Sequence, residues 1–175
     1  MLAACASAPP ILRTAAPVSQ ADQPFEIAGR LSARHGNEAA AANFRWVHGA
    51  ARDELTLATP LGSTLARLDG TAGQVRLELP DGRVTIAPDW EALTSKVLGA
   101  PIPVRGLTWW LRGAPHPGSP HTIERDTFAR ASVLRQDGWE IVYGYGEAHD
   151  RPVRLRLTFP DTELRLALDA WSDAP

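Results

Sequence analysis

The single cysteine of this 175-residue chain, Cys5, is the side chain with the widest range of chemistry. Three interpretations are open: a catalytic nucleophile, an incidental thiol, or a residue that becomes modified. A thiol nucleophile needs a histidine base that is itself oriented by a partner. The five histidines lie in or beside polar, turn-like stretches and show no such pairing pattern. They are His35, His48, His116, His121 and His149. Nucleophilic catalysis is therefore the weakest interpretation.

The stretch LAAC at residues 2–5 matches the lipobox, the short segment at which bacterial lipoprotein signal peptides are cut. In such proteins the cysteine is acylated, so the sequence predicts an acyl anchor on Cys5. Residues 6–24 are rich in Ala, Pro and Ser, as expected for a flexible tether. A signal peptide has a basic and an apolar segment ahead of this box, so we expect residues 1–5 to be its remnant. Ala6 stands where inner-membrane lipoproteins typically carry Asp, which favours the outer membrane.

Other motifs that carry chemistry are absent from the sequence, which has no Gly-rich phosphate loop, HExxH, GxSxG or Ser-x-x-Lys. His116 and His121 are a weak metal pair in a proline-rich loop. Asp89 and Glu91 are an acid pair for an enzyme acting on lipid or cell-wall glycan, but their position favours complementing a helix dipole. The formal net charge of −2 gives no reason to expect nucleic acid. A non-catalytic protein without cofactor is the favoured class.

From Phe25 onward, apolar and polar residues alternate, most clearly in VRLRLTF (153–159) and ELRLALDAW (163–171). This period predicts antiparallel strands with one dry face. Turn signals separate about ten or eleven such strands, and a single antiparallel sheet of that size must curl or split. We expect one mainly β domain over residues 25–175, with every apolar strand face turned inward, including Val84 and Ile86.

Residues 88–113 interrupt the strands with two short amphipathic stretches. The first begins at Pro88 and Asp89, has apolar residues at helical spacing, and stops at Gly99. The second, VRGLTWWLRG, ends at Gly113. The spacing predicts two helices whose apolar faces need cover, and the open face of the curved sheet is the expected partner.

Two further features need an account. Trp46, Trp139 and Trp171 fit strand positions that fill an interior, whereas Trp109 and Trp110 cannot both point into one core. Leu61 lies between Pro60 and Gly62 in the tight turn of a hairpin, and full exposure there forgoes roughly 1.5–3 kcal/mol of burial. A lone surface leucine is nonetheless common.

Taken together, several segments resemble the LolB family of outer-membrane lipoproteins, part of the LolA/LolB-like lipoprotein-localisation proteins. They are FEIAGRLSA, NFRWVHG, TPLGSTLARLDG, PIPVRGLTWWLRGAP, QDGWEIVYG and LRLALDAW, and they run in family order from residue 25 to residue 171. The combination of the PLGS turn, the PIP-x-x-x-L-x-x-W-x-x-G stretch and GW-x-V/I-x-Y is fairly specific.

The resemblance implies an incomplete, strongly curved antiparallel β-barrel with a two-helix lid over an apolar cavity. It implies a lipid-anchored monomer on the periplasmic face of the outer membrane, which receives triacylated lipoproteins from the periplasmic carrier LolA. The cargo then enters the inner leaflet of the outer-membrane bilayer. In this family the leucine of the PLG turn projects into solvent and is needed for delivery, and here that leucine is Leu61. The alternative within the superfamily is a soluble periplasmic carrier of lipid or lipoprotein.

On this basis we expect the inward strand faces and the lid to hold acyl chains, although plain core packing is the alternative for each residue. The expected strand residues are Phe44, Trp46, Leu55, Leu57, Val75, Leu77, Ile141, Tyr143, Leu155, Leu157, Leu164 and Leu166. The expected lid residues are Trp90, Leu93, Val97, Leu107, Trp110 and Leu111.

Overall fold

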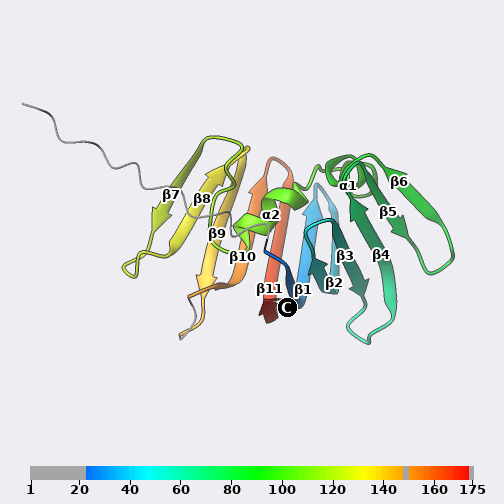
Figure 1. Cartoon of the computed structure of the whole chain (residues 1–175), viewed down its shortest axis with the longest axis horizontal. Helices are drawn as coiled ribbons and strands as arrows, with labels where there is room; N and C mark the ends of the chain where they lie inside the picture. Colours follow the sequence, from blue (N-terminus) through cyan, green and yellow to red (C-terminus); the bar gives the residue numbers. More distant parts are fainter. Residues whose placement is uncertain (1–22, 148–149, 174–175) are drawn as a thin grey trace, which may run out of the picture.

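The computed structural model describes residues 23–147 and 150–173, and all of its described strands belong to one sheet (Figure 1). The strands are β1 (Phe25–His35), β2 (Glu38–His48), β3 (Arg52–Ala58), β4 (Thr64–Thr71), β5 (Gln74–Glu78), β6 (Val84–Ala87), β7 (His121–Arg125), β8 (Ala131–Gln136), β9 (Trp139–Tyr145), β10 (Pro152–Phe159) and β11 (Thr162–Asp173). The helices are α1 (Trp90–Leu98) and α2 (Val104–Trp110).

The sheet is antiparallel throughout and runs in the order β6-β5-β4-β3-β2-β1-β11-β10-β9-β8-β7. The first and last strands in the chain therefore pair at the centre, and β6 and β7 are left as unjoined edges. This confirms the expected mainly β architecture of eleven strands in an open, incomplete barrel. Both helices lie on one face of the sheet, which we call the inner face (Figure 1).

Helix α1 begins and ends as the sequence indicates. The side chain of Asp89 caps its start by accepting a hydrogen bond from the amide of Ala92 at 2.7 Å, and Glu91 lies in the first turn. Gly99 ends the helix with φ of 74°, a left-handed conformation that glycine adopts without strain. Asp89 therefore has a capping role, as its position at a helix start predicted. Helix α2 is shorter than expected, because its helical residues stop at Trp110.

One expected strand face is wrong. Val84 and Ile86 point away from the helices and are 43% and 56% exposed. The register explains this, because Leu77 pairs with Thr85 and Val75 with Ala87, which puts Thr85 and Ala87 on the inner face. Alternation fixes which residues share a face but does not say which face is buried, and a shift of one residue exchanges the two.

Candidate functional site

The residues expected to line a cavity form one apolar cluster on the inner face, beneath the helices. Fifteen of the eighteen are buried within it: Phe44, Trp46, Val75, Leu77, Trp90, Leu93, Leu107, Trp110, Leu111, Ile141, Tyr143, Leu155, Leu157, Leu164 and Leu166. Leu55 and Leu57 are partly buried against the cluster, and Val97 is 46% exposed. The sheet and the lid thus bring most of these side chains together, and that they hold acyl chains stays a prediction.

Helix α2 is tied down at its C-terminal end by polar contacts. The indole Nε1 of Trp110 donates to the side-chain oxygen of Gln136 at 2.9 Å, and both residues are buried. The amide group of Gln136 also bonds the backbone of His116, at 3.0 Å to its N–H and 2.7 Å to its carbonyl. A buried amide with its hydrogen bonds satisfied rigidifies its surroundings. The end of α2 is therefore fixed to β8.

A second tie holds the residues after α2. The guanidinium of Arg112 lies 4.9 Å from the ring of Phe25 and 5.3 Å from that of Trp171, and it donates to the carbonyl of Gln23 at 3.0 Å. Stacking of a guanidinium on aromatic faces is attractive, and more so where water is partly excluded. Trp171 packs against the apolar cluster, with the centre of its ring 5.1 Å from that of the stacked Phe25 ring.

The C-terminal end of α1 is packed less tightly. A hollow of about 110 Å³ lies between this end and the inner face. Its apolar lining includes Ala33 of β1, Ala40 of β2, Val97 of α1, Ile102 and Leu164. Pockets that bury drug-sized ligands span roughly 300–1,000 Å³. The hollow is smaller than these, so a ligand of that size does not fit in it as the lid lies.

The hydroxyl of Tyr143 is a polar atom inside the apolar cluster. It is buried and has no hydrogen-bond partner among the described residues. Burial raises the pKa of this hydroxyl well above its ordinary value, because the phenolate would lie in an apolar medium. Leaving a buried donor unsatisfied costs about 1–3 kcal/mol. The position of Tyr143 was expected from the sequence, but the isolation of its hydroxyl was not.

Leu61 is the most exposed of the large apolar residues described, at 96%. It lies in the turn of residues 59–63 between β3 and β4. The amide of Gly62 donates to the carbonyl of Thr59 at 2.9 Å, and the amide of Ser63 to the Thr59 hydroxyl at 3.1 Å. Gly62 has φ of 88°, which needs glycine for an unstrained turn. The backbone therefore holds Leu61 out into solvent.

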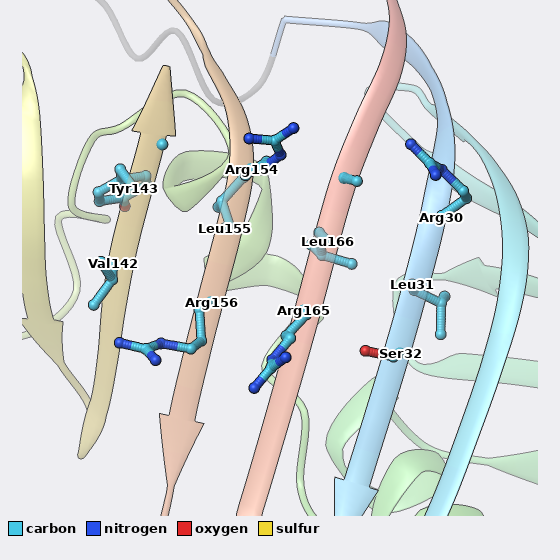
Figure 2. Close-up of a pocket in the computed structure, with 12 residues that line it drawn as sticks. Arg30, Leu31, Ser32, Val142, Tyr143, Arg154, Leu155, Arg156, Arg165 and Leu166 are labelled. Carbon is cyan, nitrogen blue, oxygen red and sulfur yellow. The ribbon is translucent and has the colours of Figure 1, made fainter. Parts of the chain in front are cut away.

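The outer face of the sheet has a different character. Figure 2 shows a trough across β9, β10, β11 and β1, where four arginines lie among leucine, valine, serine and tyrosine side chains. Arg30 pairs with Asp169 at 3.1 Å and Arg165 with Glu163 at 2.9 Å. Arg154 and Arg156 are exposed. Leu155 and Leu166 also border the trough, but their side chains are buried in the apolar cluster of the inner face, so the exposed arginines of the trough lie apart from the candidate site.

The remaining candidates are separate from this site. His116 contacts the carboxylate of Asp137 rather than His121. In residues 23–147 and 150–173, no cluster of three or more His, Cys, Asp or Glu is placed to hold a metal ion. No helix in those ranges has the length and apolar character needed to cross a membrane. Cys5, the lipobox and the tether up to residue 22 lie outside the described residues.

The chain is similar in sequence and in fold to known proteins. The family model described as outer membrane lipoprotein LolB matches residues 23–171. The outer-membrane lipoprotein LolB of Thiobacillus denitrificans is 36% identical, over 99% of this chain and 93% of its own length. That of Chromobacterium violaceum is 35% identical, over 98% and 93%. Among solved structures, a LolA superfamily protein from Nitrosomonas europaea superposes with a TM-score of 0.51 at 9% identity, covering 88% of each chain. This last likeness shows the fold alone.

Proposed function

The chain belongs to the LolB family of outer-membrane lipoproteins, and from this premise we propose that it receives lipoproteins in the lipoprotein-localisation pathway and inserts them into the outer membrane. The observation that carries the proposal is the continuous apolar inner face, which two short helices cover. The cargo is a triacylated lipoprotein, the donor is the periplasmic carrier LolA, and the acceptor is the inner leaflet of the bilayer.

The energetics of the cargo explain why such a protein is needed. Each methylene that leaves water contributes about 0.8 kcal/mol, so three acyl chains cannot cross the periplasm unshielded. Transfer proceeds downhill in free energy when the receptor's apolar face binds the acyl chains more tightly than the carrier does. The bilayer must in turn hold the chains more tightly than the receptor. This role requires an apolar site and a movable cover but no bond-making step, so the protein is not an enzyme.

The uneven packing of the lid suggests where it opens. Helix α2 is held by Trp110 and the residues that follow it, whereas the end of α1 borders a hollow. We place the opening for acyl chains at the α1 end, beside Val97 and Ile102, with α2 as the fixed side. Cargo chains then spread over the inner face as α1 lifts.

Two further roles complete the proposal. Cys5 carries the acyl anchor, and the tether of residues 6–24, about 60 Å when extended, lets the domain reach the carrier while anchored. Leu61 touches the bilayer during delivery, because an exposed apolar side chain on a rigid turn gains burial there without rearranging the fold.

The test is a delivery assay. LolA loaded with a labelled lipoprotein is mixed with this protein and outer-membrane vesicles, and the label is followed by fractionation. We expect wild type to move the label to the vesicles and Leu61→Glu to retain carrier-to-receptor transfer but lose delivery by about tenfold or more. Ile86→Glu, which places the same charge at another exposed apolar residue, should deliver normally. Absence of transfer from LolA to wild type would contradict the function, and normal delivery by Leu61→Glu would remove Leu61 from the site.

A further inference from the structure

A second hairpin turn displays a large apolar side chain. In the turn of residues 126–130, between β7 and β8, Phe128 is 76% exposed. The carboxylate of Asp126 accepts hydrogen bonds from the amides of Phe128 and Arg130, both at 2.9 Å. The turn is thus held from within, and Phe128 projects from a fixed backbone rather than from a loose loop.

The backbone of this turn repeats that of the Leu61 turn. The amide of Asp126 donates to the carbonyl of Arg130 at 2.8 Å, and that of Ala129 to Asp126 at 3.0 Å. In the Leu61 turn, the amide of Thr59 donates to the carbonyl of Ser63 at 2.8 Å, and the amide of Gly62 donates to the carbonyl of Thr59 at 2.9 Å. In both turns the third of the five residues is the exposed apolar one.

The two turns also share the backbone conformation of their fourth residue. Ala129 has φ of 63°, in the left-handed region where Gly62 lies in the other turn. For a residue with a Cβ this conformation costs roughly 1–2 kcal/mol. Strain of this kind persists where the surroundings impose it, and it clusters at functional sites.

A third turn of the same shape lacks an apolar tip. Between β5 and β6, the amide of Leu79 donates to Arg83 at 2.9 Å and that of Gly82 to Leu79 at 3.0 Å. Its third residue is Asp81, whose carboxylate accepts from the Arg83 amide at 3.0 Å. The turn shape therefore does not by itself require an apolar residue at its third position. The Asp81 turn serves as a control with a polar residue at that position.

The groups around Phe128 suit the surface of a bilayer. The guanidinium of Arg130 lies 4.9 Å from the Phe128 ring and 4.3 Å from the ring of Tyr145. Arg125 is exposed and donates to the carbonyl of Ala129 at 2.8 Å. Aromatic rings gather at the level of lipid headgroups, and nearby arginines favour the phosphates of anionic lipids.

The twist of the sheet turns the two apolar tips to the same side. Leu61 and Phe128 project from opposite ends of the strand ladder, and six interstrand steps separate β3 from β8. At about 20–25° a step, strand direction rotates well past a right angle. In Figure 1 the β3–β4 and β7–β8 turns accordingly both lie toward the lower side, at opposite flanks of the sheet.

We propose that the Phe128 turn is a second point of contact with the phospholipid bilayer, placing its ring at headgroup level while Leu61 enters on the other flank. The proposal rests on the proposed function, which already brings Leu61 to the membrane. One contact leaves the domain free to pivot, whereas two contacts across the sheet fix the orientation of the inner face relative to the bilayer.

The test uses the full chain with Cys5→Ser, so that one introduced cysteine carries an environment-sensitive fluorophore. Phe128→Cys, Leu61→Cys and Asp81→Cys are labelled in turn and mixed with vesicles of phosphatidylethanolamine and phosphatidylglycerol. We expect a blue shift and a rise in emission at positions 128 and 61 and none at position 81. In unlabelled protein, Phe128→Ser should weaken vesicle binding about five- to tenfold, Phe128→Leu should retain most of it, and Ile86→Ser should match wild type.

The outcomes separate the two proposals. A response at position 61 without one at 128 would overturn the second contact and leave the proposed function standing. No response at position 61 would contradict the membrane contact of the proposed function itself. A response at 128 that needs no vesicles, and instead follows protein concentration or added LolA, would assign the turn to a protein interface and overturn the proposal.

Discussion

The two ends of the helical lid are held by different kinds of contact. At the α2 end, Trp110 is fully buried and bonded to Gln136, and Arg112 is stacked against Phe25. At the α1 end, Val97 is half exposed above a hollow of about 110 Å³. The first end combines side-chain hydrogen bonds with stacked rings. At the hollow, apolar side chains lie beside polar ones, and the contact between α1 and the segment after it includes a hydrogen bond from the amide of Ile102 to the Thr94 hydroxyl at 2.8 Å.

This difference suggests how one protein can be both stable and able to admit cargo. Elements that move are drawn from regions with fewer buried contacts, since opening them costs less than global unfolding. Hydrogen bonds to Gln136 fix α2 in one position, while apolar contacts around Val97 can be exchanged for contacts with an acyl chain. The contrast predicts that substitutions at the α2 end act on stability and those at the α1 end on binding.

The largest effect is expected at Gln136. Gln136→Leu removes the buried amide and leaves its partners, the indole N–H of Trp110 and the backbone groups of His116, unpaired. We expect the free energy of unfolding to fall by about 3–5 kcal/mol, measured by urea denaturation. Gln74→Leu is the control, because Gln74 is exposed and should change stability by less than about 0.5 kcal/mol. Equal effects at the two sites would contradict a polar tie on α2.

A binding effect is expected at the other end. Ala33→Leu adds apolar volume on the inner face, where Ala33 borders the hollow. Because the added side chain occupies the proposed opening, we expect affinity for a fluorescent acyl-chain probe to fall by about tenfold while unfolding changes little. Ser32→Leu places the same side chain on the outer face and should bind the probe like wild type. A loss of stability with unchanged probe affinity would locate the opening elsewhere.

The sequence predicted the strands and the helices because alternation, capping residues and turn residues are local signals. It was wrong about Val84 and Ile86, since their orientation depends on how β6 pairs with β5. It passed over Phe128, because the sequence DTFAR has no glycine where PLGS does, and a left-handed alanine is not visible in a sequence. Gln136 was not singled out, because a glutamine just before a turn is usually exposed to solvent. Side chains whose roles depend on partners far along the chain escaped prediction.

A smaller effect is expected at Tyr143, the unsatisfied polar group in an otherwise well-packed cluster. Tyr143→Phe removes a hydroxyl without a hydrogen-bond partner and keeps the ring, so we expect the free energy of unfolding to rise by about 1 kcal/mol at neutral pH. Tyr145→Phe is the matched control with the opposite sign, because the hydroxyl of Tyr145 donates to the carbonyl of Ala131 at 2.8 Å. Urea denaturation of both variants measures the difference. A loss of stability in Tyr143→Phe would mean that the hydroxyl has a partner after all.

The same pair of variants gives a pH dependence with a definite sign. Burial raises the pKa of Tyr143 in the folded protein, while in the unfolded chain the phenol titrates near its ordinary value of about 10. Above that pH the unfolded state has lost a proton that the folded state still binds, so the contribution of Tyr143 to stability is constant below about pH 10 and becomes unfavourable as the pH rises beyond it. The pKa of Tyr145 is also raised by burial, and this residue is unchanged in Tyr143→Phe. The variant should therefore lose stability less steeply above pH 10 than wild type, and identical slopes would show that Tyr143 ionises freely in the folded state.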